Sequence, residues 1–200
     1  MALTIYGDHR LGNCLKVKWT AERLGIDYDW VETPGGAGAT RTRQFLRMNP
    51  AAQIPTVVLE DGRSLAQSNA ICLHLAEGSE LIPRDPYWRA KMLEWLFWEQ
   101  YSHEPYVAGR RYFKLYEGKT DAELDPEIMV RGEQALARMQ AWLGATPYLV
   151  PDQLTLADIA LVAYTRVAHE GGFDLGKYPA VKSWVGRIEA ELGLEPAQSG

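Results

Sequence analysis

The chain has 200 residues, of which 46% are hydrophobic, enough for a sizeable core in one domain or in two small ones. Its net charge of -5, with no basic stripe beside the aromatic residues, argues against nucleic acid as a partner. No apolar run approaches membrane-spanning length and the first residues do not resemble a signal peptide, so we expect a cytoplasmic protein with no membrane partner. Cys14 and Cys72 are too few for a disulfide scaffold and form no Cys-x-x-Cys pair, so we expect neither a metal site nor a dithiol couple.

The first half of the chain predicts a mixed α/β domain. Strands are expected at residues 3–6, 28–32, 56–60 and 63–66, and helices at residues 13–24, 40–48 and 67–76. Gly25 marks the end of the first helix, and Asp61-Gly62 predicts a hairpin turn between the last two strands. The glycine-rich loop at residues 33–39 lacks the Lys-Ser/Thr ending of a phosphate-binding loop. The order is β-α-β followed by β-β-α.

The second half of the chain predicts helices throughout. An aromatic-rich apolar stripe at residues 88–101 indicates a core or subunit-interface helix that kinks or restarts at Pro105. Thr155 as N-cap and Asp158 three residues later predict a structural capping box. Further helices are expected at residues 127–143, 159–167 and 180–191. A proline-containing linker at residues 81–86 divides the chain into domains at residues 1–78 and 86–200.

The segment around Ile54 and Pro55 predicts a binding device made mostly of backbone. Proline cannot donate to a sheet, and the residue before it is held extended, so Ile54 can offer its N–H and C=O to a peptide-like ligand. The helix start at Gln67 and Ser68 presents unpaired N–H groups and a positive dipole end, which favour an anion. A strand edge and an anion site in one short segment suit a small acidic peptide.

Four short motifs follow one another along nearly the whole chain. They are Ile5-Tyr6-Gly7 with Gly12-Asn13-Cys14-Leu15-Lys16-Val17, Asn49-Pro50 with Gln53-Ile54-Pro55, Gln67-Ser68-Asn69-Ala70-Ile71, and Leu154-Thr155-Leu156-Ala157-Asp158-Ile159-Ala160. In this order and spacing they resemble the cytosolic glutathione S-transferase family, in its bacterial theta-, nu- or beta-like forms. The resemblance implies a thioredoxin-like N-terminal domain, an all-helical C-terminal domain and a homodimer with glutathione as co-substrate, acting in detoxification.

The resemblance also implies roles for the binding segment. Pro55 would be the cis-proline, and the backbone of Ile54 would pair with the cysteinyl part of glutathione as an added strand does. Gln67 and Ser68 would hold the γ-glutamyl end, with Ser68 taking its carboxylate at the helix N-terminus. A plain strand boundary at Pro55 and a plain N-cap at Ser68 are the structural alternatives.

Other glutathione-binding candidates lie in the preceding loop. Gln53 would sit near the ligand, and one of Arg41 or Arg43 would meet the glycyl carboxylate. The resemblance does not choose between the two arginines.

The resemblance implies catalysis by thiol activation, in which a hydrogen-bond donor and a helix dipole lower the pKa of the glutathione thiol. Leu11 occupies the position where many relatives carry a hydroxyl or a thiol, and it cannot donate. Asn13 is the first candidate donor and Cys14 the second, while an N-cap role for Asn13 and a packing role for Cys14 both stay open. We expect the phenol of Tyr6 to lie away from the site.

The electrophile in such proteins binds between the domains. The candidates for this site are Leu11, Ser102, Tyr106 and Arg110, the last three placed on one helical face near Pro105. The co-substrate is then a small electrophile.

These patterns lead to one principal interpretation and two alternatives. The principal interpretation is a glutathione S-transferase whose bound thiolate attacks an electrophile, a disulfide or a peroxide. The first alternative is a non-catalytic binding or regulatory module, which Leu11 favours. The second is a thiol-disulfide reductase in which Cys14 itself reacts, although no second nearby cysteine is present to resolve the intermediate.

Overall fold

The structure is a computed structural model that describes residues 3–35 and 38–197. The chain divides into two compact units, the first ending at Ile82 and the second beginning at Pro83. None of the described helices is both long enough and apolar enough to cross a membrane.

A mixed sheet of four described strands forms the centre of the first unit. The strands are β1 (Leu3–Gly7), β2 (Tyr28–Glu32), β3 (Thr56–Val58) and β4 (Ser64–Ala66). They lie in the order β2-β1-β3-β4, with β1 parallel to β2 and the other neighbouring pairs antiparallel. The β1-α1-β2 connection is the parallel crossover that the sequence predicted.

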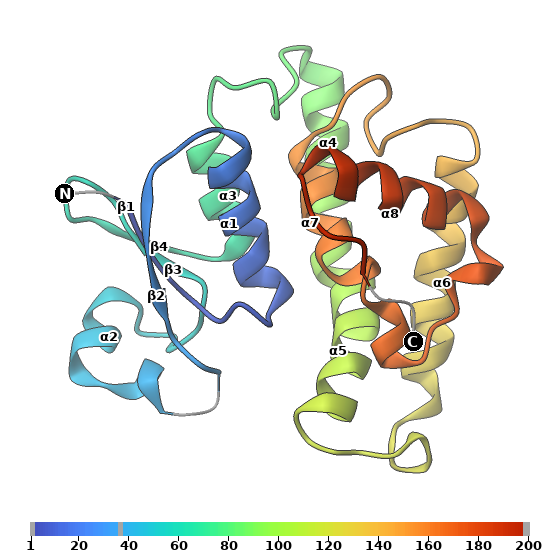
Figure 1. The fold of residues 1–200 in the computed structure, drawn as a ribbon, viewed down its shortest axis with the longest axis horizontal. Coiled ribbons are helices and arrows are strands. Elements are labelled where there is room, and N and C mark those ends of the chain that lie inside the picture. Colours follow the sequence, from blue (N-terminus) through green and yellow to red (C-terminus); the bar gives the residue numbers. More distant parts are fainter. Residues whose placement is uncertain (1–2, 36–37, 198–200) are drawn as a thin grey trace. The chain divides into compact units, whose positions relative to one another are not determined.

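Three helices complete the first unit. They are α1 (Gly12–Arg23), α2 (Arg43–Met48) and α3 (Ser68–Leu75). Figure 1 shows α1 and α3 side by side on one face of the sheet and α2 on the other side. A Cβ at Gly7 would lie 3.1 Å from the Cβ of Cys14, so the glycine lets α1 approach β1 closely. Tyr6 faces the other way and meets Phe45 of α2 edge-on, with ring centroids 6.0 Å apart.

The second unit is helical throughout its described residues. Its α-helices are α4 (Pro86–Trp98), α5 (Glu104–Leu115), α6 (Pro126–Leu143), α7 (Leu156–Thr165) and α8 (Pro179–Glu191). Every residue of α7 is buried, and this helix contacts α4, α5 and α8. The all-helical C-terminal domain and the thioredoxin-like N-terminal domain are therefore confirmed.

A buried capping box starts α7. Thr155 accepts a hydrogen bond from the backbone of Ala157, and the carboxylate of Asp158 accepts from the backbone N–H of Thr155 at 3.0 Å. The same carboxylate accepts from the backbone of Leu149 at 3.0 Å and from the indole of Trp184 at 2.9 Å. Burial raises the pKa of Asp158 to about 6, against the lowering effect of these donors. The predicted structural role of this carboxylate is confirmed.

The expected break near Pro105 takes the form of a π-helical turn, Glu99–His103, which joins α4 directly to α5. Proline has no N–H to donate to the carbonyl one turn earlier, so the helix widens locally instead of stopping. The other differences from the sequence analysis are shifts of a few residues at element ends. The largest are at the starts of α2 and α7, which begin at Arg43 and Leu156 rather than at residues 40 and 159.

Candidate functional site

Asn49 shapes the loop that carries Ile54 and Pro55. Its side-chain amide donates to the carbonyl of Gln53 at 2.9 Å and to the hydroxyl of Thr56 at 3.0 Å. Its side-chain oxygen accepts from the backbone of Ala51 at 3.0 Å, and the whole residue is only 5% exposed. Asn49 therefore holds the loop at residues 51–56 from its buried side. The backbone of Ile54 on the other side of this loop corner is left open to a ligand.

Ile54 sits at this corner immediately before β3. The peptide bond between Ile54 and Pro55 is cis, as the resemblance implied. Within the described residues, neither the backbone N–H nor the backbone C=O of Ile54 has a hydrogen-bond partner. The residue thus presents the unpaired strand edge that an extended peptide could join.

The end of β4 brings Gln67 next to this corner. Thr56 pairs with Ala66, so Pro55 and Gln67 lie one position beyond the end of the same antiparallel ladder. Gln67 has φ 72° and ψ 111°, a conformation that non-glycine residues rarely adopt and that clusters at ligand sites. It is also the N-cap of α3 and provides no side-chain cap. The first N–H groups of α3 therefore open beside the Ile54 corner.

Asn13 lies at the start of α1 and contacts the start of α3. The hydroxyl of Ser68, which is 6% exposed, donates to the side-chain oxygen of Asn13 at 3.1 Å. The ammonium of Lys16 donates to the same oxygen at 2.7 Å. Two donors converge on one oxygen, so the orientation of the carboxamide is fixed and its NH₂ group is on the opposite side. Asn13 is thereby held in one orientation between the starts of α1 and α3.

Lys16 is a further candidate residue, to which the sequence analysis gave no role. Its side chain is completely buried, which is rare for lysine unless its charge is paired. The sequence did contain a signal, because Lys16 follows Asn13 by three residues and so shares its helix face. Lys16 adds a positive charge directly behind the proposed donor.

The loop before α1 is fixed by a buried carboxylate. Asp8 accepts from the guanidinium of Arg10 at 2.7 and 3.0 Å, and from the backbone of Gly35 at 3.1 Å. The hydrogen bonds from Arg10 hold the pKa of this carboxyl well below its usual range. Leu11, the N-cap of α1, offers no side-chain cap and is half-buried. These contacts of Asp8 hold the loop although the cap residue of α1 is apolar.

Cys14, the second candidate donor, is buried in the structure rather than open to a ligand. Its side chain is fully buried, and burial raises the pKa of its thiol to about 12. A thiol with this pKa is almost entirely protonated at neutral pH and is a poor nucleophile. Cys72, on α3, is also buried. The structure therefore favours the packing role for Cys14 over the catalytic one.

The remaining glutathione candidates are exposed. Gln53 is part of the corner that Asn49 fixes, and its side chain faces solvent. Arg41 ends a short 3₁₀ turn, Ala39–Arg41, and Arg43 begins α2. Both arginine side chains are exposed, so the structure does not choose between them either.

Two of the electrophile-site candidates share a pocket in the second unit. Ser102 and Tyr106 line a cavity of about 290 Å³, together with Trp98, Arg131 and others. Arg110 is not among its lining residues.

Arg110 is instead 5% exposed and has structural partners. Its guanidinium donates to the carbonyl of Gly171 at 2.8 Å and to Asp121 at 2.6 Å. We expected Arg110 to share a helical face with Ser102 and Tyr106. This expectation does not hold, because the two hydrogen bonds direct its side chain toward Gly171 and Asp121 instead. We leave it out of the proposed electrophile site.

One group of possible metal ligands occurs among the described residues. Asp8, His9 and Glu32 bring ligand atoms within 4.8 Å of one another. Arg10 already occupies both oxygens of Asp8, and the indole of Trp30 donates to Glu32 at 2.7 Å. These contacts make the group an ion-pair network, and we assign it no metal.

Comparisons with known proteins agree with this geometry. Residues 12–77 match the model of the glutathione S-transferase N-terminal domain, and residues 95–191 match that of the C-terminal domain. A glutathione S-transferase structure from Pseudomonas fluorescens Pf-5 is 43% identical, with a TM-score of 0.91 over 100% of this chain and 98% of that one. A glutathione S-transferase structure from Xanthobacter autotrophicus Py2 is also 43% identical, with a TM-score of 0.89 over 99% and 96% of the two chains.

A curated relative is the disulfide-bond oxidoreductase YfcG of Escherichia coli K12. It is 29% identical over 182 residues, which cover 88% of this chain and 85% of the relative. The two domain models and the full-length structural matches give one conclusion. The chain belongs to the glutathione S-transferase family.

Proposed function

We propose that this protein binds glutathione in the first unit and activates its thiol for attack on a small electrophile. The observation that carries the proposal is the carboxamide of Asn13, held by Ser68 and Lys16 with its donor side turned away from them. The family membership supports glutathione as the ligand.

The binding roles follow from the backbone. An extended cysteinyl residue of glutathione would pair with the free N–H and C=O of Ile54. The γ-glutamyl carboxylate would accept from the backbone N–H of Ser68 at the start of α3, where the helix dipole favours negative charge, while the Ser68 hydroxyl keeps its proton on Asn13. Gln67 and Gln53 border this position, and Arg41 or Arg43 would meet the glycyl carboxylate.

The chemical role belongs to Asn13. Its NH₂ group would donate to the glutathione sulfur and stabilise the thiolate, and the positive charge of Lys16 behind it would act in the same direction. The thiolate then attacks the electrophile and displaces its leaving group or adds to it. Leu11 has no polar group and would contribute only an apolar surface.

Ser68 provides the test of the binding site. We expect Ser68→Ala to weaken glutathione binding about tenfold, because Asn13 loses one of the two donors that hold its side chain in the binding orientation. Isothermal titration calorimetry with glutathione measures this change. Ser64→Ala, on the neighbouring strand β4, is the matched control, because among the described residues its hydroxyl bonds only to the Met48 carbonyl. Absence of binding to the unmodified protein at millimolar glutathione would refute the proposal.

Reduction of a disulfide is the second candidate reaction, and the similarity to YfcG favours it. In this reaction the bound glutathione thiolate attacks a disulfide sulfur, forms a mixed disulfide and releases the other sulfur as a thiolate. A second glutathione would then resolve the mixed disulfide. The buried thiol of Cys14 does not take part in this scheme.

A homodimer is part of the same proposal. Phe97 and Tyr101, near the junction of α4 with the π-helical turn, are 74% and 83% exposed. Large exposed aromatic side chains on one helix are typical of subunit contacts. The pocket that contains Ser102 and Tyr106 lies on this stretch, and we retain those two residues as electrophile-site candidates.

A further inference from the structure

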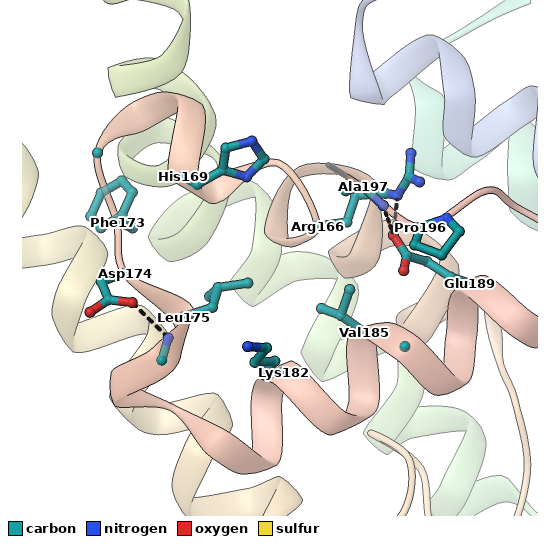
Figure 2. Close-up of a pocket in the computed structure, with 13 residues that line it drawn as sticks. Arg166, His169, Phe173, Asp174, Leu175, Lys182, Val185, Glu189, Pro196 and Ala197 are labelled. Carbon is teal, nitrogen blue, oxygen red and sulfur yellow. Dashed lines mark hydrogen bonds and ion pairs between the residues drawn. The ribbon is translucent and has the colours of Figure 1, made fainter. Parts of the chain in front are cut away.

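Asp8 is the one buried carboxylate among the described residues of the first unit. An ionised carboxylate is costly to bury unless hydrogen-bond donors surround it. The second unit shows what such a group can do, because the buried Glu189 accepts from the guanidinium of Arg166 at 2.8 Å and from the backbone of Ala197 at 3.1 Å (Figure 2). That carboxylate links α8 to the segments on either side of it in the sequence.

Asp8 likewise joins two segments of the first unit. Its Oδ1 accepts from the backbone N–H of Arg10 at 2.9 Å and from the Nε of the same residue at 3.0 Å. Its Oδ2 accepts from the Nη2 of Arg10 at 2.7 Å and from the backbone N–H of Gly35 at 3.1 Å. Gly35 follows β2, so the carboxylate ties the loop between β1 and α1 to the segment after β2.

This tie brings the segment after β2 against Leu11. The backbone N–H of Thr33 donates to the carbonyl of Gly7 at 2.7 Å, and a Cβ added at Gly35 would lie 3.5 Å from Cδ1 of Leu11. Leu11 offers no side-chain cap to α1, and the first turn of this helix contains no acidic residue. The loop, rather than a capping side chain, therefore fixes where α1 begins.

The first turn of α1 is built directly on this loop. The backbone N–H of Leu11 donates to the carbonyl of Asp8 at 3.0 Å, and the carbonyl of Leu11 accepts from the N–H of Cys14 at 2.9 Å. Asn13 lies within this turn. A shift of the loop therefore moves the backbone that carries the carboxamide of Asn13.

We propose that Asp8 is a positioning residue for thiol activation. The inference rests on the proposed role of Asn13 as the donor to the glutathione sulfur. Asp8 acts through the loop that it ties down, so that the amide of Asn13 and the first N–H groups of α1 meet the thiolate in one geometry. Displacement of such a donor by about 1 Å can cost about 100-fold in rate.

Ultraviolet titration of the thiol of bound glutathione tests the proposal in Asp8→Asn and Arg10→Ala. Asparagine has one oxygen where aspartate has two, so Asp8→Asn turns an NH₂ group toward other donors. Arg10→Ala keeps the carboxylate and its bonds to the backbone of residues 10 and 35 but removes the guanidinium. We expect the pKa of the bound thiol to rise in both, by about 1 in Asp8→Asn, and kcat at saturating glutathione to fall about tenfold in Asp8→Asn and less in Arg10→Ala.

The two substitutions separate positioning from a direct effect of charge. Loss of the anion alone lowers the thiol pKa, and loss of the cation alone raises it, so a charge effect gives opposite signs. Loss of the tie gives the same sign in both variants. Opposite signs, or a thiol pKa unchanged in both, would overturn the proposal. Should Asp8→Asn not fold, an unchanged pKa in Arg10→Ala, whose side chain is 49% exposed in the unmodified protein, would do the same.

His9→Ala is the matched control in the same loop. The side chain of His9 is 67% exposed and contacts Glu32 at the surface, so we expect the thiol pKa and kcat to stay unchanged. The unmodified protein separates this inference from the proposed function. An unshifted thiol pKa there refutes activation itself, whereas a lowered pKa that both variants share refutes only the role of Asp8.

Discussion

Asn13→Ala is expected to lower turnover with glutathione by about 10- to 100-fold, because the thiolate loses its fixed donor. The side-chain oxygen of Asn13 takes hydrogen bonds from Lys16 and Ser68, and its NH₂ group is the part of the carboxamide that would donate to a ligand. A conjugation assay at saturating glutathione measures the change in kcat apart from any change in binding.

Asn13→Asp separates the donor role from simple packing. Aspartate has nearly the same shape and can still accept from Lys16 and Ser68, but it has no NH₂ group. We expect it to be as impaired as Asn13→Ala. Full activity in Asn13→Asp would contradict the donor role. Cys14→Ala should keep most of the activity, and its inactivity would instead favour the reductase alternative in which Cys14 reacts.

Asp158→Ala is expected to lower the free energy of unfolding by about 4 kcal/mol, because it leaves several buried donors without an acceptor. These donors are the backbone N–H groups of Leu149 and Thr155 and the indole N–H of Trp184. Both Asp158 and Trp184 are completely buried, so water cannot replace the carboxylate. Urea denaturation followed by fluorescence measures the loss.

Asp158→Asn is the matched control for this position. One carboxylate oxygen accepts from both Leu149 and Trp184, and the asparagine oxygen can keep these two bonds. The other oxygen accepts from Thr155, where the asparagine NH₂ would face a donor. We therefore expect an intermediate loss of stability, about half that of Asp158→Ala. Equal stability of all three proteins would show that the carboxylate does not hold α7 in place.

Local patterns in the sequence were sufficient for most of the fold. The capping box at Thr155 and the turn at Gly62 depend on short-range geometry, so residue type and spacing predicted them correctly. The break near Pro105 was predicted as a kink or a restart of the helix, and it is a π-helical turn that leads directly into α5. The missing N–H is evident from the sequence, but the packing that decides how the helix responds is not.

The candidate site was only partly predictable, because its central contact is not local. Ser68 and Asn13 are 55 residues apart, and only the packing of α3 against α1 brings them within hydrogen-bond distance. The complete burial of Lys16 also depends on tertiary structure, since a lysine in an amphipathic helix is normally expected in solvent. The same holds for Arg110, whose partners Gly171 and Asp121 come from other segments.

Ultraviolet titration of the thiolate of bound glutathione tests the central claim most directly. In the unmodified protein we expect the pKa of the bound thiol to fall below about 7.5, compared with about 8.5 for a free cysteine thiol. In Asn13→Ala the pKa should return most of the way to the free value, since only the helix dipole and Lys16 would remain. A bound thiol whose pKa is unshifted in the unmodified protein would contradict activation and would favour a non-catalytic binding module.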